Sequence, residues 1–185
     1  GKLDVLFFKF LVLDSQHLLL SVLLRPCHGS FSRVGEVRQL EQLGTLAGLS
    51  QPPRRLEAYD IPNTGSADMV ASMVVFHDGK PLKRDYRRFQ IKTLSAPDDY
   101  AAMREVLMRR FRRYLDGDEK FDKAPDLLLI DGGETHARTA REALASLGLA
   151  LPILGMVKDD RHRTRALVAP DGQELGIYRQ AVEEQ

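Results

Sequence analysis

Two aspartates stand at positions where a metal-dependent reaction could take place. Asp60 ends a short apolar segment that contains YDI, and Asp131 ends the run PDLLLID just before two glycines. If two such segments are neighbouring strands, their ends lie close together, and paired carboxylates suit Mg²⁺ or Mn²⁺ because these ions prefer oxygen ligands. Ions of this kind can activate water for phosphodiester hydrolysis. The alternative is that each aspartate only caps the turn that follows it.

A second feature is a local excess of positive charge between residues 83 and 113. The window holds ten Lys and Arg against four Asp and Glu, a net of +6, in a chain whose overall net charge is +1. Aromatic residues are interleaved with these cations, and such a patch would bind phosphates with little dependence on sequence. A solvated helix face is the alternative. The candidate nucleic-acid contacts are Arg87, Arg88, Lys92, Arg109, Arg110, Arg113 and, beyond this window, Lys158.

Histidines offer further candidates for a ligand or a general base. His162 lies in the charged segment KDDRHRTRA, and His136 comes about one helical turn after Asp131. Imidazole can fill either role near neutral pH. Both residues could equally be exposed side chains with no chemical part, and His77 is expected to be a turn residue.

The periodicity of the sequence predicts the elements that must position these residues. The helix over 99–115 should bury Met103, Val106, Leu107 and Phe111, with its arginines on the opposite face. Because strands and helices alternate, the order predicts an α/β domain with a mixed sheet. The expected elements are a helix over 36–49, strands over 54–61, 69–76 and 81–91 with an Asp78-Gly79 turn, the helix over 99–115, a strand over 125–131, a helix over 134–149, a strand over 151–157 and a hairpin around Asp171-Gly172.

Composition limits the class of protein. The chain has 185 residues, 43% of them hydrophobic, and a single cysteine, which excludes a mostly disordered chain and a disulfide framework. We divide it into an N-terminal segment, 1–50, and a domain, 51–185, at the pair Pro52-Pro53. The apolar runs within the first 24 residues are too short for a membrane span. We expect strands or a helix there, or the remnant of an upstream domain, and we expect a reducing, cytoplasmic setting.

The motifs also resemble a known family when they are taken in order. YDI, VASMVVF, DYRRF, DDYAAM, LIDGG and GMVKDD occur in the sequence of this chain in the order found in the C-terminal nuclease domain of UvrC, the incision subunit of the bacterial UvrABC excinuclease. The resemblance covers about residues 36–180. It implies an α/β fold of the RNase H-like type, a mixed sheet flanked by helices.

The resemblance also implies an activity and site residues. Members of this family nick the damaged DNA strand on the 5′ side of a lesion with a divalent metal, downstream of UvrA and in contact with the UvrB–DNA complex. The metal-binding aspartates of the family fall on Asp60 and Asp131, which makes Mg²⁺ or Mn²⁺ the expected cofactor. Asp99, in the DDY motif, matches a further acidic position tied to incision.

The chain departs from the family pattern in several places. The family has a Gly-Lys-Gly-Gln segment close to the double glycine, where this chain has Glu134, Thr135 and His136. A histidine motif similar to HRFA, which completes the site in the family, does not occur here. We therefore expect a truncated or degenerate copy with weak nicking activity, or a catalytically silent fragment that binds DNA or a partner, and leave open whether it is an enzyme.

Overall fold

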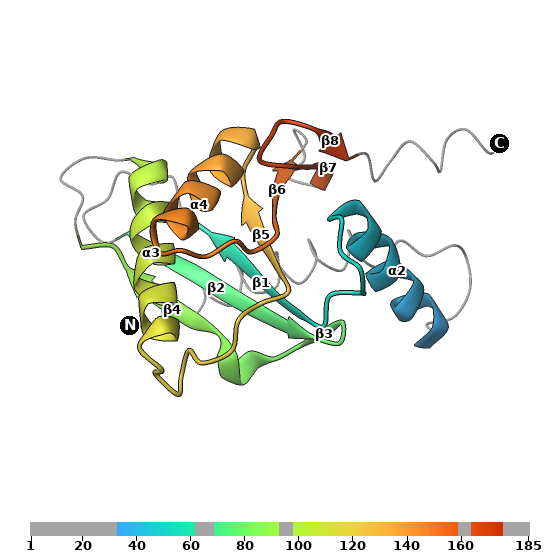
Figure 1. Ribbon diagram of the computed structural model, residues 1–185, viewed down its shortest axis with the longest axis horizontal. Coiled ribbons are helices and arrows are strands. Elements are labelled where there is room, and N and C mark those ends of the chain that lie inside the picture. Colours follow the sequence, from blue (N-terminus) through green and yellow to red (C-terminus); the bar gives the residue numbers. More distant parts are fainter. Residues whose placement is uncertain (1–32, 62–68, 93–97, 159–163, 176–185) are drawn as a thin grey trace.

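An eight-stranded mixed sheet forms the centre of the molecule in the computed structural model (Figure 1). The structure describes residues 33–61, 69–92, 98–158 and 164–175. The strands are β1 (Arg55–Asp60), β2 (Val70–His77), β3 (Lys80–Pro81), β4 (Arg87–Gln90), β5 (Leu127–Asp131), β6 (Ile153–Lys158), β7 (Thr164–Val168) and β8 (Glu174–Leu175). The helices are α2 (Arg33–Leu46), α3 (Asp99–Leu115) and α4 (Glu134–Ser146), with a short 3₁₀ turn, η1 (Lys83–Asp85).

The strand order places β1 and β5 next to each other in the middle of the sheet. The order is β3-β2-β1-β5-β6-β7-β8. β4 also pairs with the first half of β2, whereas β3 pairs with the end of β2. β1, β5 and β6 run parallel, whereas β2, β4, β7 and β8 pair antiparallel with their neighbours. The connection from β5 through α4 to β6 is the helical crossover that parallel strands require.

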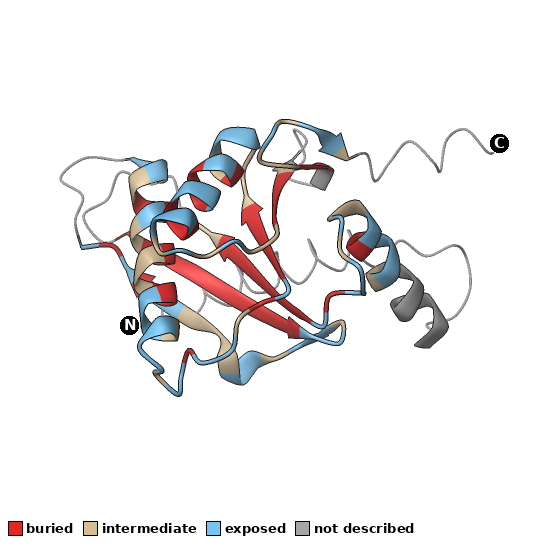
Figure 2. Ribbon diagram, in the orientation of Figure 1, coloured by how far each residue is buried: buried red, intermediate tan, exposed pale blue. Residues whose placement is uncertain are grey.

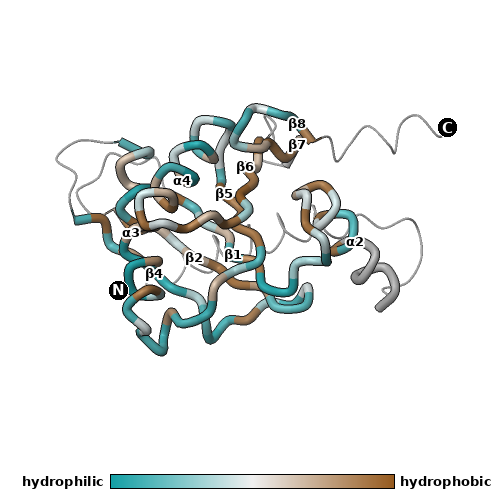
Figure 3. The backbone as a smooth tube through the Cα atoms, viewed as in Figure 1, coloured by the Kyte–Doolittle hydropathy of each residue, from teal (hydrophilic) through white to brown (hydrophobic). Residues whose placement is uncertain are grey.

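Each central strand contributes alternate residues to two separate cores, one on each face of the sheet. In Figure 2 the central strands are coloured as buried, and Figure 3 shows hydrophobic stretches along them. The α3/α4 core lies under the two long helices and contains Tyr59, Met73, Leu107, Leu128 and Ile130. The α2 core lies on the other face and contains Leu43, Leu56, Val74, Phe76, Leu129 and Met156. Both faces are therefore apolar, which explains why β2 and β5 read as continuous hydrophobic runs.

The predicted helices form close to their expected bounds. Asp98 caps α3, because its carboxylate accepts a hydrogen bond from the backbone amide of Ala101 at 3.0 Å. Met103, Val106, Leu107 and Phe111 are all buried, as the periodicity predicts. The helix predicted over 36–49 corresponds to α2, which begins and ends about three residues earlier.

One predicted element is wrong in detail. The strand expected over 81–91 is divided into β3, η1 and β4. The Asp78-Gly79 turn forms as expected, with both φ angles positive (51° and 78°). After it, the amide of Leu82 bonds the carbonyl of Val75 at 2.8 Å, and the 3₁₀ turn follows, so regular pairing with β2 resumes only at Arg87.

Some sequence predictions fall outside the described residues. These are the apolar segments before residue 25, the side chain of Lys158 and the loop that contains His162. No helix in the described part of the chain is long and apolar enough to cross a membrane.

Candidate active site

The strand register brings the two predicted metal ligands together. β1 and β5 are parallel neighbours, and their paired residues run from Leu56↔Leu127 to Tyr59↔Ile130. The next residue on each strand is Asp60 and Asp131, so the two aspartates are adjacent across a strand spacing of about 4.8 Å. Both are half-buried. The pairing is therefore consistent with the prediction that the two aspartates end neighbouring strands.

Alternation along the strands places both aspartates on the same face. Tyr59 and Ile130 point into the α3/α4 core, so the residues that follow them point toward the opposite face. Asp60 pairs with Ser72 of β2, and Ser72 pairs with Arg88 of β4. Because directly paired residues share a face, Arg88, Ser72, Asp60 and Asp131 form one row across four strands.

Ser72 is conspicuous within this row. It is only 6% exposed and is the one polar residue among the buried positions of β2, where its neighbours are alanine, methionine, valine and phenylalanine. The exposed Arg88 lies about two strand spacings, roughly 10 Å, from Asp60.

Three glycines shape the chain directly after Asp131. Gly132 has φ +151°, and a side chain there would meet the His136 ring, whose Cγ would be 2.4 Å from the added Cβ. On β6, a Cβ at Gly155 would lie 2.7 Å from the Gly132 carbonyl oxygen and 2.9 Å from that of Gly133. The turn from β5 into α4 therefore passes directly over Gly155, which fixes the backbone next to Asp131.

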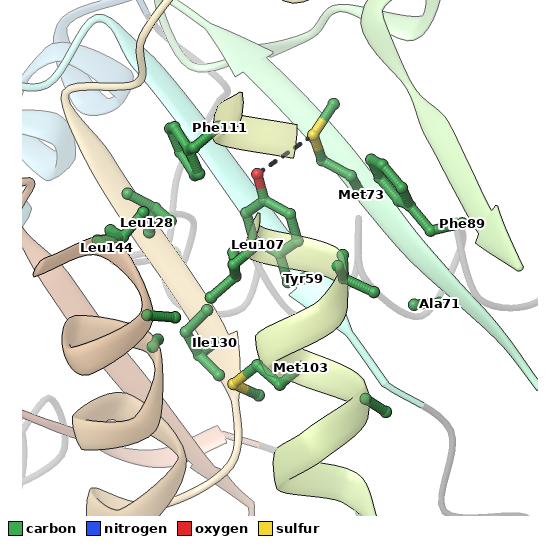
Figure 4. Close-up of a cluster of buried hydrophobic side chains, with 14 of the residues drawn as sticks. Tyr59, Ala71, Met73, Phe89, Met103, Leu107, Phe111, Leu128, Ile130 and Leu144 are labelled. Atoms are coloured by element: carbon green, nitrogen blue, oxygen red, sulfur yellow. Dashed lines mark hydrogen bonds between the residues drawn. The ribbon is translucent and has the colours of Figure 1, made fainter. Parts of the chain in front are cut away.

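The first turn of α3 lies at the same edge of the sheet. In Figure 4, Met103 lies beside Ile130 near the end of β5, whereas Phe111 lies nearer Leu128. The start of α3, with the half-buried Asp99, is therefore at the edge where β1 and β5 end. The Tyr100 ring contacts the His136 ring of α4 there, with centroids 4.6 Å apart.

The donor set at this edge fits a hard divalent cation. Two adjacent carboxylates supply oxygen ligands, and Mg²⁺ in proteins is commonly held by one or two carboxylates with waters in the remaining positions. Among the described residues no group of three or more His, Cys, Asp or Glu could hold a metal ion. Asp60 and Asp131 both take part in interactions of their own, so neither carboxylate is free.

Arg110 was expected on the exposed face of α3, and this expectation is wrong. The side chain is completely buried and forms two hydrogen bonds with the carboxylate of Glu57, at 2.9 and 3.1 Å. Its remaining donors bond the carbonyl oxygens of Phe121 and Lys123. A guanidinium with every face covered by protein does not contact DNA in this conformation.

The Glu57 carboxylate is the centre of a buried polar network. Tyr59 donates a hydrogen bond to it at 2.7 Å, and Arg55 donates another at 3.1 Å. Burial, followed by the negative charge of Glu57, raises the pKa of Tyr59 well above its usual value. Burial acts to lower the pKa of Arg110, but the hydrogen bonds and charges of Glu57 and Tyr59 outweigh it and raise that pKa.

Three of the predicted DNA contacts rest on aromatic rings. The Arg87 and Arg113 guanidinium groups lie 5.4 and 5.0 Å from the ring centre of Phe121. Arg109 lies 5.7 Å from the ring centre of Phe89 and donates to the Gln90 carbonyl at 2.6 Å. Arg88 and Lys92 are exposed. This places a basic surface, made by Arg87, Lys92, Arg109 and Arg113, along the junction of α3 and β4.

The residue patterns did not single out Ser72 or Tyr100. A polar residue inside an otherwise apolar buried strand was a usable signal for Ser72. The position of Tyr100, between Asp99 and the buried stripe of α3, indicated only that it lies near the helix start. His136 was a candidate, and the structure places its ring against Gly132, next to Asp131.

The mixed sheet with helices on its faces defines an α/β domain, and the family model that matches it is of the RNase H-like nuclease class. The sequence model of the UvrC RNase H endonuclease domain matches residues 44–184. The chain belongs to this family.

Individual relatives agree with this assignment. The chain is 48% identical over 145 residues to UvrABC system protein C of Ruminiclostridium cellulolyticum, which covers 74% of this chain and 24% of that protein. It is 51% identical over 121 residues to the protein of the same name from Finegoldia magna, and this match covers 64% of this chain and 20% of that protein. The chain thus spans about a quarter of the length of these relatives. Among solved structures, the catalytic domain of human Endonuclease V shares 16% identity with this chain, with 90% of this chain and 74% of that one covered and a TM-score of 0.39, and the assignment does not rest on it.

Proposed function

We propose that this domain hydrolyses a phosphodiester bond of DNA with Mg²⁺ or Mn²⁺ held between Asp60 and Asp131. The observation that carries the proposal is the strand register, which makes these two residues neighbours on one face of the sheet in a chain that belongs to the UvrC RNase H endonuclease family. A divalent ion bound there would activate water and stabilise the charge that develops on the phosphate.

The residues of the chain divide the remaining tasks. Asp60 and Asp131 hold the ion, and their position at the ends of rigid central strands keeps their spacing constant. Arg88, which is exposed and lies in the same row, neutralises a phosphate next to the one that is cleaved. Asp99 lies at the same edge, at the start of α3, but outside the ligand set of the ion, because the described residues contain no group of three such ligands.

The basic surface of Arg87, Lys92, Arg109 and Arg113 binds the DNA backbone away from the point of cleavage. Rings behind three of these guanidinium groups hold them in place. Arg87 also donates to the carbonyl oxygens of Arg84, Tyr86 and Lys120, so the exposed Lys92 and Arg113 offer the main donors for phosphate oxygens. We expect Lys158, the last residue of β6, to extend this set. Arg110 does not belong to it, because that side chain is buried.

The names of the relatives suggest the biological setting. They are named as components of the UvrABC system. We propose that the domain acts in bacterial nucleotide excision repair, in the cytoplasm, and makes the nick on the 5′ side of a lesion. Its partners would be damaged DNA in complex with UvrB and, indirectly, UvrA.

Neutralising one aspartate tests the metal site. Asp60→Asn and Asp131→Asn should each lower Mn²⁺ affinity at least tenfold, because one charged ligand is lost while the shape of the side chain is kept. Binding is measured by electron paramagnetic resonance of free Mn²⁺, and nicking by the conversion of supercoiled plasmid. Asp122→Asn, at an exposed position on the loop before β5, is the matched control and should bind Mn²⁺ as the wild type does.

The outcomes separate two functions. Unchanged Mn²⁺ binding in both site variants would contradict the proposed metal site. If metal binding and nicking are absent in the wild type but the chain still binds DNA in a salt-dependent way, the domain is a DNA-binding module without nuclease chemistry.

A further inference from the structure

Tyr100 stands out among the aromatic residues because much of its ring is in solvent. It is 42% exposed, and in the described part of the chain only Leu115 is a comparably exposed large hydrophobic residue. An exposed aromatic side chain that is also held in place costs little entropy when it contacts a ligand. The two residues lie at opposite ends of α3, Tyr100 at the start and Leu115 at the end.

Its position on the helix is held by neighbouring contacts. The Tyr100 ring contacts the imidazole of His136 with centroids 4.6 Å apart and the planes tilted by 40°. The Asp98 cap fixes the first turn of α3, in which Tyr100 lies. His136 packs in turn against Gly132, which accepts the ring because it has no Cβ.

The same contacts place the ring pair at the edge that carries the aspartates. Gly132 is the residue directly after Asp131, and the His136 ring lies against it. Tyr100 directly follows Asp99 in the first turn of α3. Two contacts and one peptide bond therefore connect the solvent-exposed ring to the backbone of a predicted metal ligand.

From this placement we propose that Tyr100, supported by His136, is a stacking platform for an unpaired DNA base next to the cleaved phosphate. The inference rests on the proposed function and adds to it a subsite for a nucleobase. Aromatic side chains stack on bases with little regard to sequence because every base has a π-face. An unpaired base offers both faces, whereas a base inside a duplex has its faces covered.

The local charges favour a base over a phosphate at this position. Asp98 and Asp99 directly precede Tyr100 at the start of α3. A phosphate brought against this ring would meet the charge of these two carboxylates, whereas a neutral base would not be repelled by them. The cation one helical turn away on α3, Arg104, lies 3.7 Å from the carboxylate of Glu142 on α4, and the basic surface proposed for phosphates lies on β4 and the later turns of α3.

The experiment uses the fluorescent base 2-aminopurine, whose emission falls when it stacks. A 12-nucleotide single strand that carries this base at one position in turn is titrated with the 185-residue chain in Ca²⁺, to limit hydrolysis. For the wild type we expect quenching at one or two neighbouring positions of the bound strand. Tyr100→Ala should abolish the quenching and weaken binding about tenfold, whereas Tyr100→Phe should keep both.

Leu115→Ala is the matched control, since it removes an exposed apolar side chain from the same helix. It should leave quenching and affinity at wild-type values. His136→Ala should reduce quenching less than Tyr100→Ala, because the ring remains but loses its support. A thermal melt of each variant shows whether it is folded, and Tyr100→Phe keeps the test valid if the alanine variant is not.

Two different failures can be told apart. If Tyr100→Ala binds the strand and quenches as the wild type does, the ring pair is only a contact between α3 and α4, and the stacking proposal is overturned. If the wild type binds no oligonucleotide and Asp60→Asn leaves Mn²⁺ binding unchanged, the proposed function itself fails.

Discussion

At the scale of single residues, Arg110 and Arg113 show how little residue type says about environment. They are three positions apart on α3, yet Arg110 is completely buried and Arg113 is exposed on the ring of Phe121. A signal for this was present, because Arg110 follows Met103 by seven residues and Val106 by four, which is the spacing of the buried stripe. The second indication was Glu57, an acidic residue within a buried strand, which needs a positively charged partner.

Removing Arg110 should therefore reduce stability rather than DNA binding. Arg110→Ala leaves Glu57 buried without its main partner, and breaking a buried pair in this way costs about 3–5 kcal/mol of unfolding free energy. Urea denaturation measures the change. Arg112→Ala, at an exposed neighbouring position, should stay within about 0.5 kcal/mol of the wild type.

The double variant makes the test sharper. Glu57→Gln combined with Arg110→Met removes both charges, so it should lose less stability than the sum of the two single changes. Additive losses would contradict a direct pair, and a loss below 1 kcal/mol for Arg110→Ala would contradict its burial.

At the scale of elements, the turn from β5 into α4 connects the site to the fold. The turn crosses β6 at Gly155, and its carbonyl oxygens occupy the space that a side chain would need. Paired glycines after an apolar strand predicted a turn, but the requirement at Gly155 could not be predicted. It arises from the contact between two segments that are more than twenty residues apart in the sequence.

Gly155→Ala should disturb both stability and the site. Its Cβ would lie 2.7 Å from the Gly132 oxygen, 2.8 Å from a methyl group of Val168 and 2.9 Å from the Gly133 oxygen. Overpacking of this kind costs about 1–3 kcal/mol. Because the turn must shift, Mn²⁺ affinity should also fall, and calorimetric titration measures it.

The matched control for this change is Gly133→Ser. Space around Gly133 is open, and serine suits the N-cap position of a helix, which Gly133 occupies in α4. We expect wild-type stability and metal affinity for this variant. An equal loss in both variants would show that the turn tolerates no side chain anywhere, and would contradict a specific contact at Gly155.

At the scale of the whole molecule, α2 is packed onto the sheet. Leu43 is 3% exposed and lies in the α2 core with Leu56 and Phe76. We predicted a boundary between residues 50 and 51, and this division stays a prediction. The packing crosses this boundary, because the last turns of α2 cover one face of the sheet and shield it from water.

Leu43→Ala should therefore destabilise the sheet as well as the helix. Truncating a buried leucine costs about 2–5 kcal/mol, and the loss should appear in a single unfolding transition followed by circular dichroism. Gln42→Ala, at an exposed position of the same helix, is the control and should change stability by less than about 0.5 kcal/mol. If α2 unfolds alone while the remainder keeps its wild-type midpoint, the helix is a separate unit.

The sequence by itself determined the order of the central elements and the positions of both aspartates at strand ends. These follow from local patterns, because hydrophobic period and turn residues act over a few positions. Only the tertiary structure decided that Asp60 and Asp131 are neighbours, that Ser72 and Arg88 share their row, that Arg110 is buried and that Tyr100 meets His136. Each of these depends on strand register or helix packing between distant segments, and local patterns do not specify such contacts.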